Sequence, residues 1–154
     1  VMISLGFSKP CTAPALWFYI YDEDILPARV YAPDIKSPNN VPHGCSALQA
    51  EIYYSRYKEI PEDLELLKEN VIQQLLKLGL FQKDDIIVSD VRMKQYANVM
   101  FTPPVYQARD EIHRYLRAVD IEYAGRWGEW DYLWVGQSLK SGRNAAERCM
   151  ESIK

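Results

Sequence analysis

The residues with the clearest chemical potential lie near the C-terminus, between Gly125 and Arg148. This stretch reads GRWGEWDYLWVGQSLKSGRNAAER, so aromatic side chains and glycines precede a run of helix-forming residues. We expect the helix to start around Gly136, Gln137 and Ser138, where small residues leave backbone N–H groups open to an acceptor. The pattern therefore predicts a helix N-terminus that receives a hydrogen-bond-accepting or negatively charged group.

The same residues also fit a purely structural interpretation. Trp127, Trp130, Tyr132 and Trp134 can pack in a buried turn between a strand and a helix, and a glycine before a helix is a common turn. Gly142 and the two alanines that follow it suit a helix face packed closely on an adjacent sheet. Taken alone, these residues leave both interpretations open.

Composition places the chain among ordinary globular proteins. Its 154 residues suit one compact domain, with 48% hydrophobic and 25% charged residues and a net charge of −3. Acids and bases are interspersed, which excludes the basic surface that nucleic-acid binding needs, and no apolar run approaches the length of a membrane span. The first ten residues lack the pattern of a signal peptide and open inside an apolar stretch without an initiator Met. We therefore expect this chain to be part of a longer one.

The cysteines and histidines show no pattern of a reactive or metal-binding site. Cys11, Cys45 and Cys149 are widely spaced and include no CxxC pair, which predicts free thiols in a reducing compartment and hence a cytoplasmic protein. His43 and His113 are far apart, and the charged neighbours of His113 favour a solvated surface position.

The first third of the chain has the pattern of β-strands. Runs of β-branched and aromatic residues, separated by Pro, Asp and Gly, predict strands over 2–7, 15–21, 28–33 and 45–55. Residues 84–101 predict one long strand or two, and residues 121–125 a short strand leading to Gly125.

Three helices are predicted in the rest of the chain. The first runs from Pro61 to Leu78, and the last from Gln137 to the end. The second begins at Pro103 with Thr102 as its cap, and its expected buried face consists of Ile112, Leu116 and Val119. Strands and helices are segregated along the chain, so the predicted class is α+β, with a mixed or antiparallel sheet and helices packed on one face.

Several complete catalytic motifs are absent from the sequence. It contains no GxGxxG and no P-loop, and therefore no complete nucleotide cradle of its own. It also contains no HExxH and no GxSxG. The chain alone is not expected to form a self-sufficient active site.

Residues 125–148 resemble the closing motif of FAD-dependent amine oxidase-like flavoproteins, which include protoporphyrinogen oxidase-like proteins and UDP-galactopyranose mutase relatives. In that family a glycine at a strand end is followed by Arg, aromatic residues and a helix whose N-terminus meets the flavin. The helix typically carries SGRxAAE, matched here by residues 141–147. Weaker similarity upstream extends the resemblance to most of the chain. It implies that residues 1–154 are a substrate-binding region with a flavin-contacting helix, a fragment of a larger flavoprotein fold whose N-terminal Rossmann-type FAD domain is absent from this chain.

The resemblance also implies a cofactor and candidate binding residues. FAD would be bound by the full-length parent and not tightly by this chain alone, and a small molecule would be the substrate. The family usually has Asp at the position of Gly136. Arg29 and Tyr96 are candidates for the substrate cavity, with solvated surface positions as the alternative. The residues implied at the flavin are Gly125, Arg126, Trp130, Gly136, Gln137 and Ser138.

These implications lead to one predicted function with two alternatives. The chain would contribute the substrate cavity and part of the flavin site of an FAD-dependent oxidoreductase of the amine oxidase type. The alternatives are part of a nucleotide-sugar mutase-like flavoenzyme of surface polysaccharide biosynthesis, and a non-catalytic binding module. We also expect an exposed docking face for the missing domain near Val1–Phe7 and Trp127–Trp134, with possible self-association through it.

Overall fold

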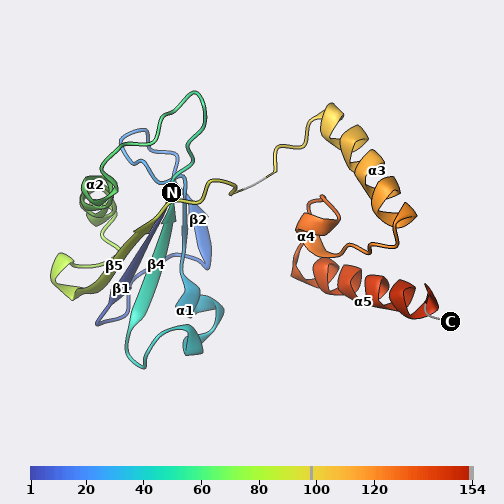
Figure 1. The fold of residues 1–154 in the computed structure, drawn as a ribbon. Coiled ribbons are helices and arrows are strands. Elements are labelled where there is room, and N and C mark those ends of the chain that lie inside the picture. Colours follow the sequence, from blue (N-terminus) through green and yellow to red (C-terminus); the bar gives the residue numbers. More distant parts are fainter. Residues whose placement is uncertain (98, 153–154) are drawn as a thin grey trace. The chain divides into compact units, whose positions relative to one another are not determined.

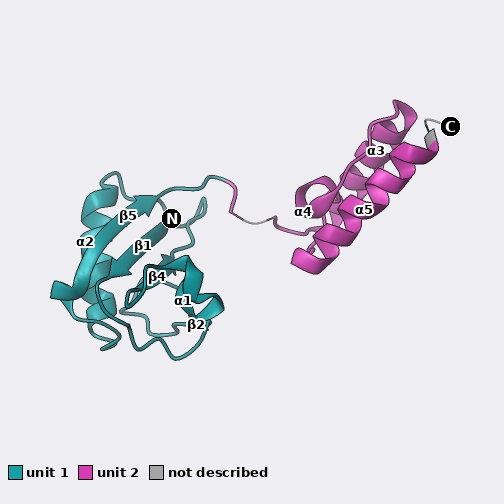
Figure 2. Cartoon of the chain, turned by 90° about the horizontal axis from the view of Figure 1, so that it is seen from below, with its two compact units in different colours: residues 1–95 teal, residues 96–154 magenta. Residues whose placement is uncertain are grey.

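The computed structural model describes residues 1–97 and 99–152, with side chains as far as residue 151. Asn98 and residues 153–154, which belong to the predicted strand over 84–101 and to the predicted last helix, lie outside the described residues. The chain forms two compact units, residues 1–95 and 96–154 (Figure 2). We describe each unit by itself.

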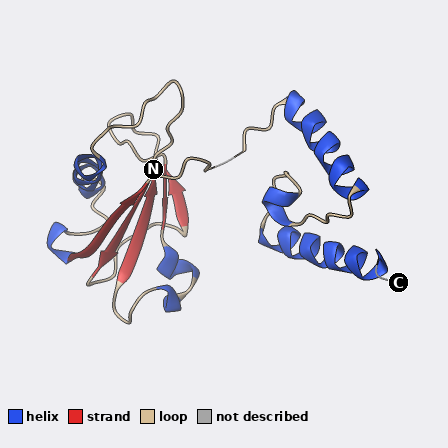
Figure 3. Cartoon of the chain, viewed as in Figure 1, coloured by secondary structure: helices blue, strands red, loops and turns tan. Residues whose placement is uncertain are grey.

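The first unit is built around one antiparallel sheet of five strands (Figures 1 and 3). The strand order is β2-β3-β4-β1-β5, and each neighbouring pair is antiparallel. This confirms the predicted α+β class and the antiparallel alternative for the sheet. The strands are β1 (Met2–Phe7), β2 (Trp17–Tyr19), β3 (Arg29–Tyr31), β4 (Ser46–Glu51) and β5 (Ile86–Arg92).

The hydrophobic core lies between the sheet and helix α2 (Leu64–Leu76). Side chains alternate along β1 and β4, so every second residue of each strand faces the core. The strands supply Ile3, Leu5, Phe7, Leu48 and Ala50, which are almost fully buried, and α2 covers them with Leu67, Val71, Ile72 and Leu75.

The predicted docking face near Val1–Phe7 is wrong. β1 is the second strand from one edge, hydrogen-bonded to β4 on one side and to β5 on the other. Ile3, Leu5 and Phe7 of β1 are almost fully buried under α2 within the first unit, so they are not available to a missing domain.

Each of the strands β2 and β5 extends only as far as the neighbouring strand with which it pairs. β5 ends at Arg92 because its antiparallel partner β1 begins at Met2, which lies opposite Arg92. The predicted strand over 84–101 is accordingly too long, and no described residue from 93 to 101 is in a strand. β2 is likewise limited to the three residues that pair with β3.

Helix α2 starts three residues later than predicted because of its cap. The Asp63 carboxylate accepts a hydrogen bond of 2.9 Å from the backbone N–H of Leu66, which satisfies one of the free N–H groups of the first turn. Gly79 follows the helix with φ +68°, in the left-handed region that favours glycine, as the predicted stop requires. Three short helical turns complete the first unit: α1 (Pro33–Lys36), Pro38–Asn40 and Lys83–Asp85.

The second unit consists of helices α3 (Pro103–Ala118), α4 (Gly125–Gly128) and α5 (Val135–Ser152). α3 ends as a Schellman motif, in which Asp120 is left-handed at φ +56° and Ile121 donates its N–H to the carbonyl oxygen of Leu116. The predicted strand over 121–125 is absent, because the chain turns back there and Gly125 opens α4.

Burial in the second unit is sparse. Among its described residues only Tyr123, Ser141 and Ala145 are buried, and α3 contributes none of them. The predicted buried face of α3 is therefore wrong: Ile112 is 57% exposed, Val119 is exposed and Leu116 is half-buried.

His113 is not the solvated surface residue that its neighbours predicted. Its ring stacks on Tyr123 with the centroids 3.9 Å apart, and its Nε2 lies 3.0 Å from the carbonyl oxygen of Gly128. This contact joins α3 to the α4 turn. In the described part of the chain, no helix has the length and apolar character needed to cross a membrane.

The burial of two leucines of α2 predicts that replacing them has different effects on the free energy of unfolding. Replacing the fully buried Leu75 by Ala should lower the free energy of unfolding by about 2–5 kcal/mol, because it removes transfer energy and leaves a cavity. Replacing Leu66, which is 58% exposed, should change it by no more than about 0.5 kcal/mol. Urea denaturation followed by circular dichroism measures both, and similar losses would contradict the described core.

Candidate functional site

The start of α5 presents three backbone N–H groups without a helical partner. The first α-helical hydrogen bond runs from the N–H of Ser138 to the carbonyl oxygen of Trp134, at 2.8 Å. The N–H groups of Val135, Gly136 and Gln137 precede it and therefore have no acceptor within the helix. The side-chain oxygen of Gln137 accepts from the backbone N–H of Trp134 at 2.9 Å, which is half of a capping box. The helix thus starts at Val135, one to two residues before the predicted start at Gly136 or Gln137, and the N–H of Ser138 already donates to Trp134.

Gly136 keeps this helix end open. A Cβ atom built at Gly136 would meet nothing within 4 Å, so no side chain or backbone covers the first turn at this position. Because the positive end of the helix dipole lies there, the exposed N–H groups suit an anionic or carbonyl acceptor.

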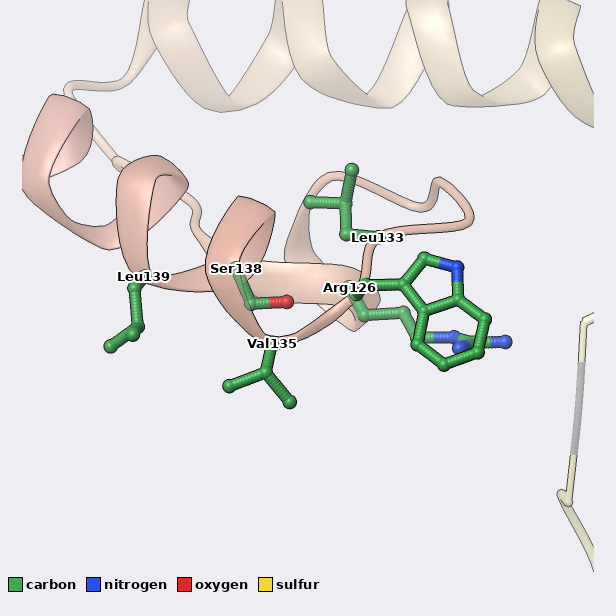
Figure 4. A pocket seen from close by; sticks show the side chains of 6 residues that line it. Arg126, Leu133, Val135, Ser138 and Leu139 are labelled. Carbon is green, nitrogen blue, oxygen red and sulfur yellow. The ribbon is translucent and has the colours of Figure 1, made fainter. Parts of the chain in front are cut away.

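An open hollow of about 500 Å³ lies beside this turn (Figure 4). The Arg126 guanidinium carbon lies 4.2 Å from the ring centroid of Tyr132, a cation–π contact that helps to hold the arginine in place. Arg126 and the start of α5 therefore both contribute positive potential to the hollow. Its lining residues are Arg126, Leu133, Trp134, Val135, Ser138 and Leu139.

The turn that carries Arg126 is fastened to α5 by one buried serine. Ser141 Oγ accepts a hydrogen bond of 2.9 Å from the N–H of Gly125 and donates one of 2.7 Å to Glu129 Oε1. Gly125 has φ +75°, so a residue with a Cβ would be strained there. The glycine and the serine together set the path of the chain between α4 and α5.

The structure separates the predicted flavin residues into two groups. Arg126, Gly136, Gln137 and Ser138 meet at the start of α5 or in the adjacent hollow. Gly125 does not line the hollow and serves the turn. Trp130 is also outside the lining, is left-handed at φ +51°, and packs against Trp127 with the ring centroids 5.6 Å apart. Their predicted roles at a flavin therefore remain predictions.

The aromatic residues of this stretch are not enclosed. Trp127, Trp134 and Tyr132 are about half exposed, and Trp130 slightly less so. This agrees with the expected exposure of Trp127–Trp134, and it does not fit the interpretation of a buried turn.

Arg29 is held by an acidic partner rather than left as an isolated cation. Its Nη2 lies 2.7 Å from Glu51 Oε1 and its Nε 3.1 Å from Oε2, and hydrogen bonding to Glu51 keeps the pKa of Arg29 above its ordinary value. Tyr53 donates to the same carboxylate at 2.6 Å, and burial, followed by this bond, raises its pKa to about 12. The charge of Arg29 is therefore compensated by Glu51, and its predicted role in a substrate cavity remains a prediction.

Arg29 belongs to a polar and aromatic sheet face that the sequence interpretation did not identify. The register places two rows of residues on the face opposite the core, and these rows combine aromatic rings with carboxylate, amide and guanidinium groups. Period-two alternation was the signal for them, because each residue is out of phase with a core residue. The rows are Tyr19, Arg29, Glu51, Met2 and Arg92, and Trp17, Tyr31, Gln49, Ser4 and Asp90.

Tyr96 has no comparable surroundings. It is 78% exposed and belongs to the second unit, whereas Arg29 belongs to the first, so neither unit contains both predicted substrate residues. Among the residues that the structure describes, no three His, Cys, Asp or Glu side chains form a group able to hold a metal ion.

Comparison with known proteins finds similarity at the level of the fold. No family model matches the chain, and no curated protein matches it. Among solved structures, a reduced UDP-galactopyranose mutase is similar to it with a TM-score of 0.70 and 22% sequence identity. The match covers 85% of this chain and 28% of that chain. The chain thus has the fold of a part of this larger enzyme, as the predicted relation to UDP-galactopyranose mutase requires.

The Ser141 contact predicts a local loss of stability. Ser141→Ala should lower the free energy of unfolding by about 1–3 kcal/mol, because it leaves the N–H of Gly125 and the carboxylate of Glu129 without their buried partner. Ser138→Ala, on the same helix, should cost less than about 0.5 kcal/mol. Tryptophan fluorescence during urea unfolding measures the effect, because three of the four tryptophans lie in the second unit. Equal effects of the two variants would refute the role given to Ser141.

Proposed function

We propose that this chain supplies the substrate cavity and part of the flavin site of an FAD-dependent enzyme with an amine oxidase-like fold. The observation that carries the proposal is the fold shared with UDP-galactopyranose mutase over 85% of the chain. The resemblance of residues 125–148 to a flavin-contacting motif supports it independently. Because the chain spans only 28% of the solved mutase, the complete activity belongs to a longer protein that contains this sequence.

The start of α5 is the part of this chain best suited to meet a flavin. A reduced flavin carries negative charge along its N1–C2=O edge, and the N–H groups of Val135, Gly136 and Gln137 would stabilise that charge. Arg126 adds a positive side chain in the adjacent hollow. FAD supplies the redox chemistry when it is bound, and the residues of this chain orient it and stabilise its charge.

Two chemistries fit this arrangement. An oxidoreductase would take a hydride from a substrate C–H bond, such as the one beside an amine nitrogen, as in the amine oxidase-like proteins that residues 125–148 resemble. A nucleotide-sugar mutase would use reduced flavin on its substrate, as the solved neighbour suggests. The aromatic and polar face of the sheet fits either, because aromatic rings stack on flat or apolar substrate surfaces and the polar groups orient them.

The proposal predicts that the longer protein is yellow. After purification it should show flavin absorbance in stoichiometric amount, whereas residues 1–154 alone should show none, because the adenine and pyrophosphate contacts are missing. Two assays separate the mutase from the oxidoreductase. A mutase converts UDP-galactopyranose after the flavin is reduced by dithionite, and an oxidoreductase of the amine oxidase type consumes oxygen when amines are added. A longer protein that stays colourless in excess FAD would overturn the proposal and leave a non-catalytic binding module.

A further inference from the structure

An open hollow of about 470 Å³ lies in the first unit, between the start of α2 and the loop of residues 52–63 that leads to it. We call it the α2 hollow. Its floor is continuous with the core, because Leu67 is only 4% exposed, whereas the preceding Leu66 also lines the hollow and is 58% exposed. The apolar interior of the first unit therefore reaches the surface here, in a hollow large enough for a ligand or a large side chain. Its apolar lining residues are Leu26, Tyr54, Pro61, Leu66 and Leu67.

The loop wall of the α2 hollow is held in place by contacts within the first unit. Ser55 and Lys58 exchange two backbone hydrogen bonds, of 3.1 and 3.0 Å, which close a tight turn. Lys58 is the one cation among the described lining residues, and its Nζ lies 5.2 Å from the centroid of the Tyr54 ring, in a cation–π contact. Leu26 donates its N–H to Gln74 Oε1 of α2 at 2.8 Å. Because these contacts order the walls beforehand, an occupant loses little binding free energy to the ordering of the hollow.

The surface around the α2 hollow is acidic. Residues 59–70 contain five carboxylates and one cation, Lys68, which is paired with Glu65. Glu59 and Glu69 are exposed, and neither forms an ion pair within the described part of the chain. Acids in the first turn of a helix stabilise it through the helix dipole, but Glu59 precedes α2 and Glu69 lies beyond its first turn. The charges of these two residues are therefore available to a partner.

Carboxylates flank the apolar surface on both sides. Leu66 lies between Asp63 and Glu69, three residues away in each direction, and residues with this spacing are neighbours on a helix surface. These two acids are about 9 Å apart along the helix axis, and Glu59 lines the hollow from the loop. A small cation reaches one of these carboxylates at a time. A chain that inserts an apolar side chain and carries basic residues before and after it reaches several.

We infer that the α2 hollow binds a segment of a partner protein in which a large apolar side chain is flanked by Lys or Arg residues. The apolar side chain fills the hollow against Leu67 and Tyr54, and its basic neighbours pair with Glu59 and Glu69. Charge complementarity selects this occupant, because an acidic segment would be repelled and a neutral one would gain no ion pair. The inference goes beyond the proposed function. The α2 hollow belongs to the first unit and the start of α5 to the second, so either idea can fail without the other.

Three fluorescent peptides test the inference on the longer protein. The first peptide has one leucine between two pairs of lysines, the second has serine in place of the leucine, and the third has glutamates in place of the lysines. Measured by fluorescence anisotropy at low ionic strength, the first should bind about tenfold or more tightly than either of the others, because it alone combines apolar burial with opposite charge.

Absence of binding of the first peptide, or equal binding of the first and second, would overturn the inference. Binding of the first peptide by residues 1–154 but not by the longer protein would also overturn it, because the remainder of the longer protein then covers the hollow. A second copy of the chain as the occupant would be shown by sedimentation as a dimer that the first peptide does not dissociate, and this too would overturn it.

Two pairs of variants test whether the first peptide binds at the α2 hollow. Leu66→Ala should weaken its binding about fivefold, whereas Ile87→Ala, which shortens a similarly exposed side chain on β5, should leave it unchanged. Glu59→Lys should also weaken it about fivefold, whereas Glu111→Lys, with the same change of charge on α3, should not. All four side chains are exposed, so each variant should melt like the unmodified protein. Equal effects within either pair would overturn the inference.

Discussion

The path of the chain between α4 and α5 depends on the hydroxyl group of Ser141. It is buried, and it joins the N–H of Gly125 to the carboxylate of Glu129. Two neighbouring groups would otherwise lack a partner in a unit with few buried residues. This connection holds the turn with Arg126 beside the first turn of α5, and so places a cation at the hollow that Val135 also lines.

The first unit reaches its stability by different means. Its sheet and α2 enclose a continuous apolar core, and the opposite face of the same strands is left to aromatic and polar side chains. The pair of Arg29 and Glu51 shows how such a face is kept ordered without burial of a lone charge, since the bidentate contact compensates the arginine and Tyr53 satisfies the same carboxylate.

Features that depend on residues close together in the sequence were predicted correctly. Alternation predicted the strands and the α+β class, and the helix start after the aromatic stretch predicted the open end of α5 to within two residues. Features that depend on partners were not predictable in the same way. β5 ends opposite the first residue of β1, and nothing in the sequence of 93–101 indicates this end. The sequence of α3 is amphipathic, although its own unit buries little of the helix. His113 was assigned from its charged neighbours, whereas its contacts come from Tyr123 and Gly128, distant in sequence.

The difference between local and partner-dependent features also explains why only one of the two segments of the expected docking face is exposed. Val1–Phe7 and Trp127–Trp134 were both apolar segments near expected boundaries. Only the second is exposed, because α2 covers the apolar side chains of β1.

The central claim is that the start of α5 stabilises negative charge on a flavin. The most direct measurement is the midpoint potential of FAD in the longer protein with Gly136→Asp, compared with Asn144→Asp, which adds the same charge farther along the helix. An aspartate in the first turn offsets the positive helix end by roughly 0.3–1 kcal/mol or more, so the reduced flavin should be disfavoured and the potential should fall by on the order of 20 mV. Asn144→Asp should leave the potential unchanged. Equal potentials in both variants and the unmodified protein would contradict the placement of the flavin at this helix end.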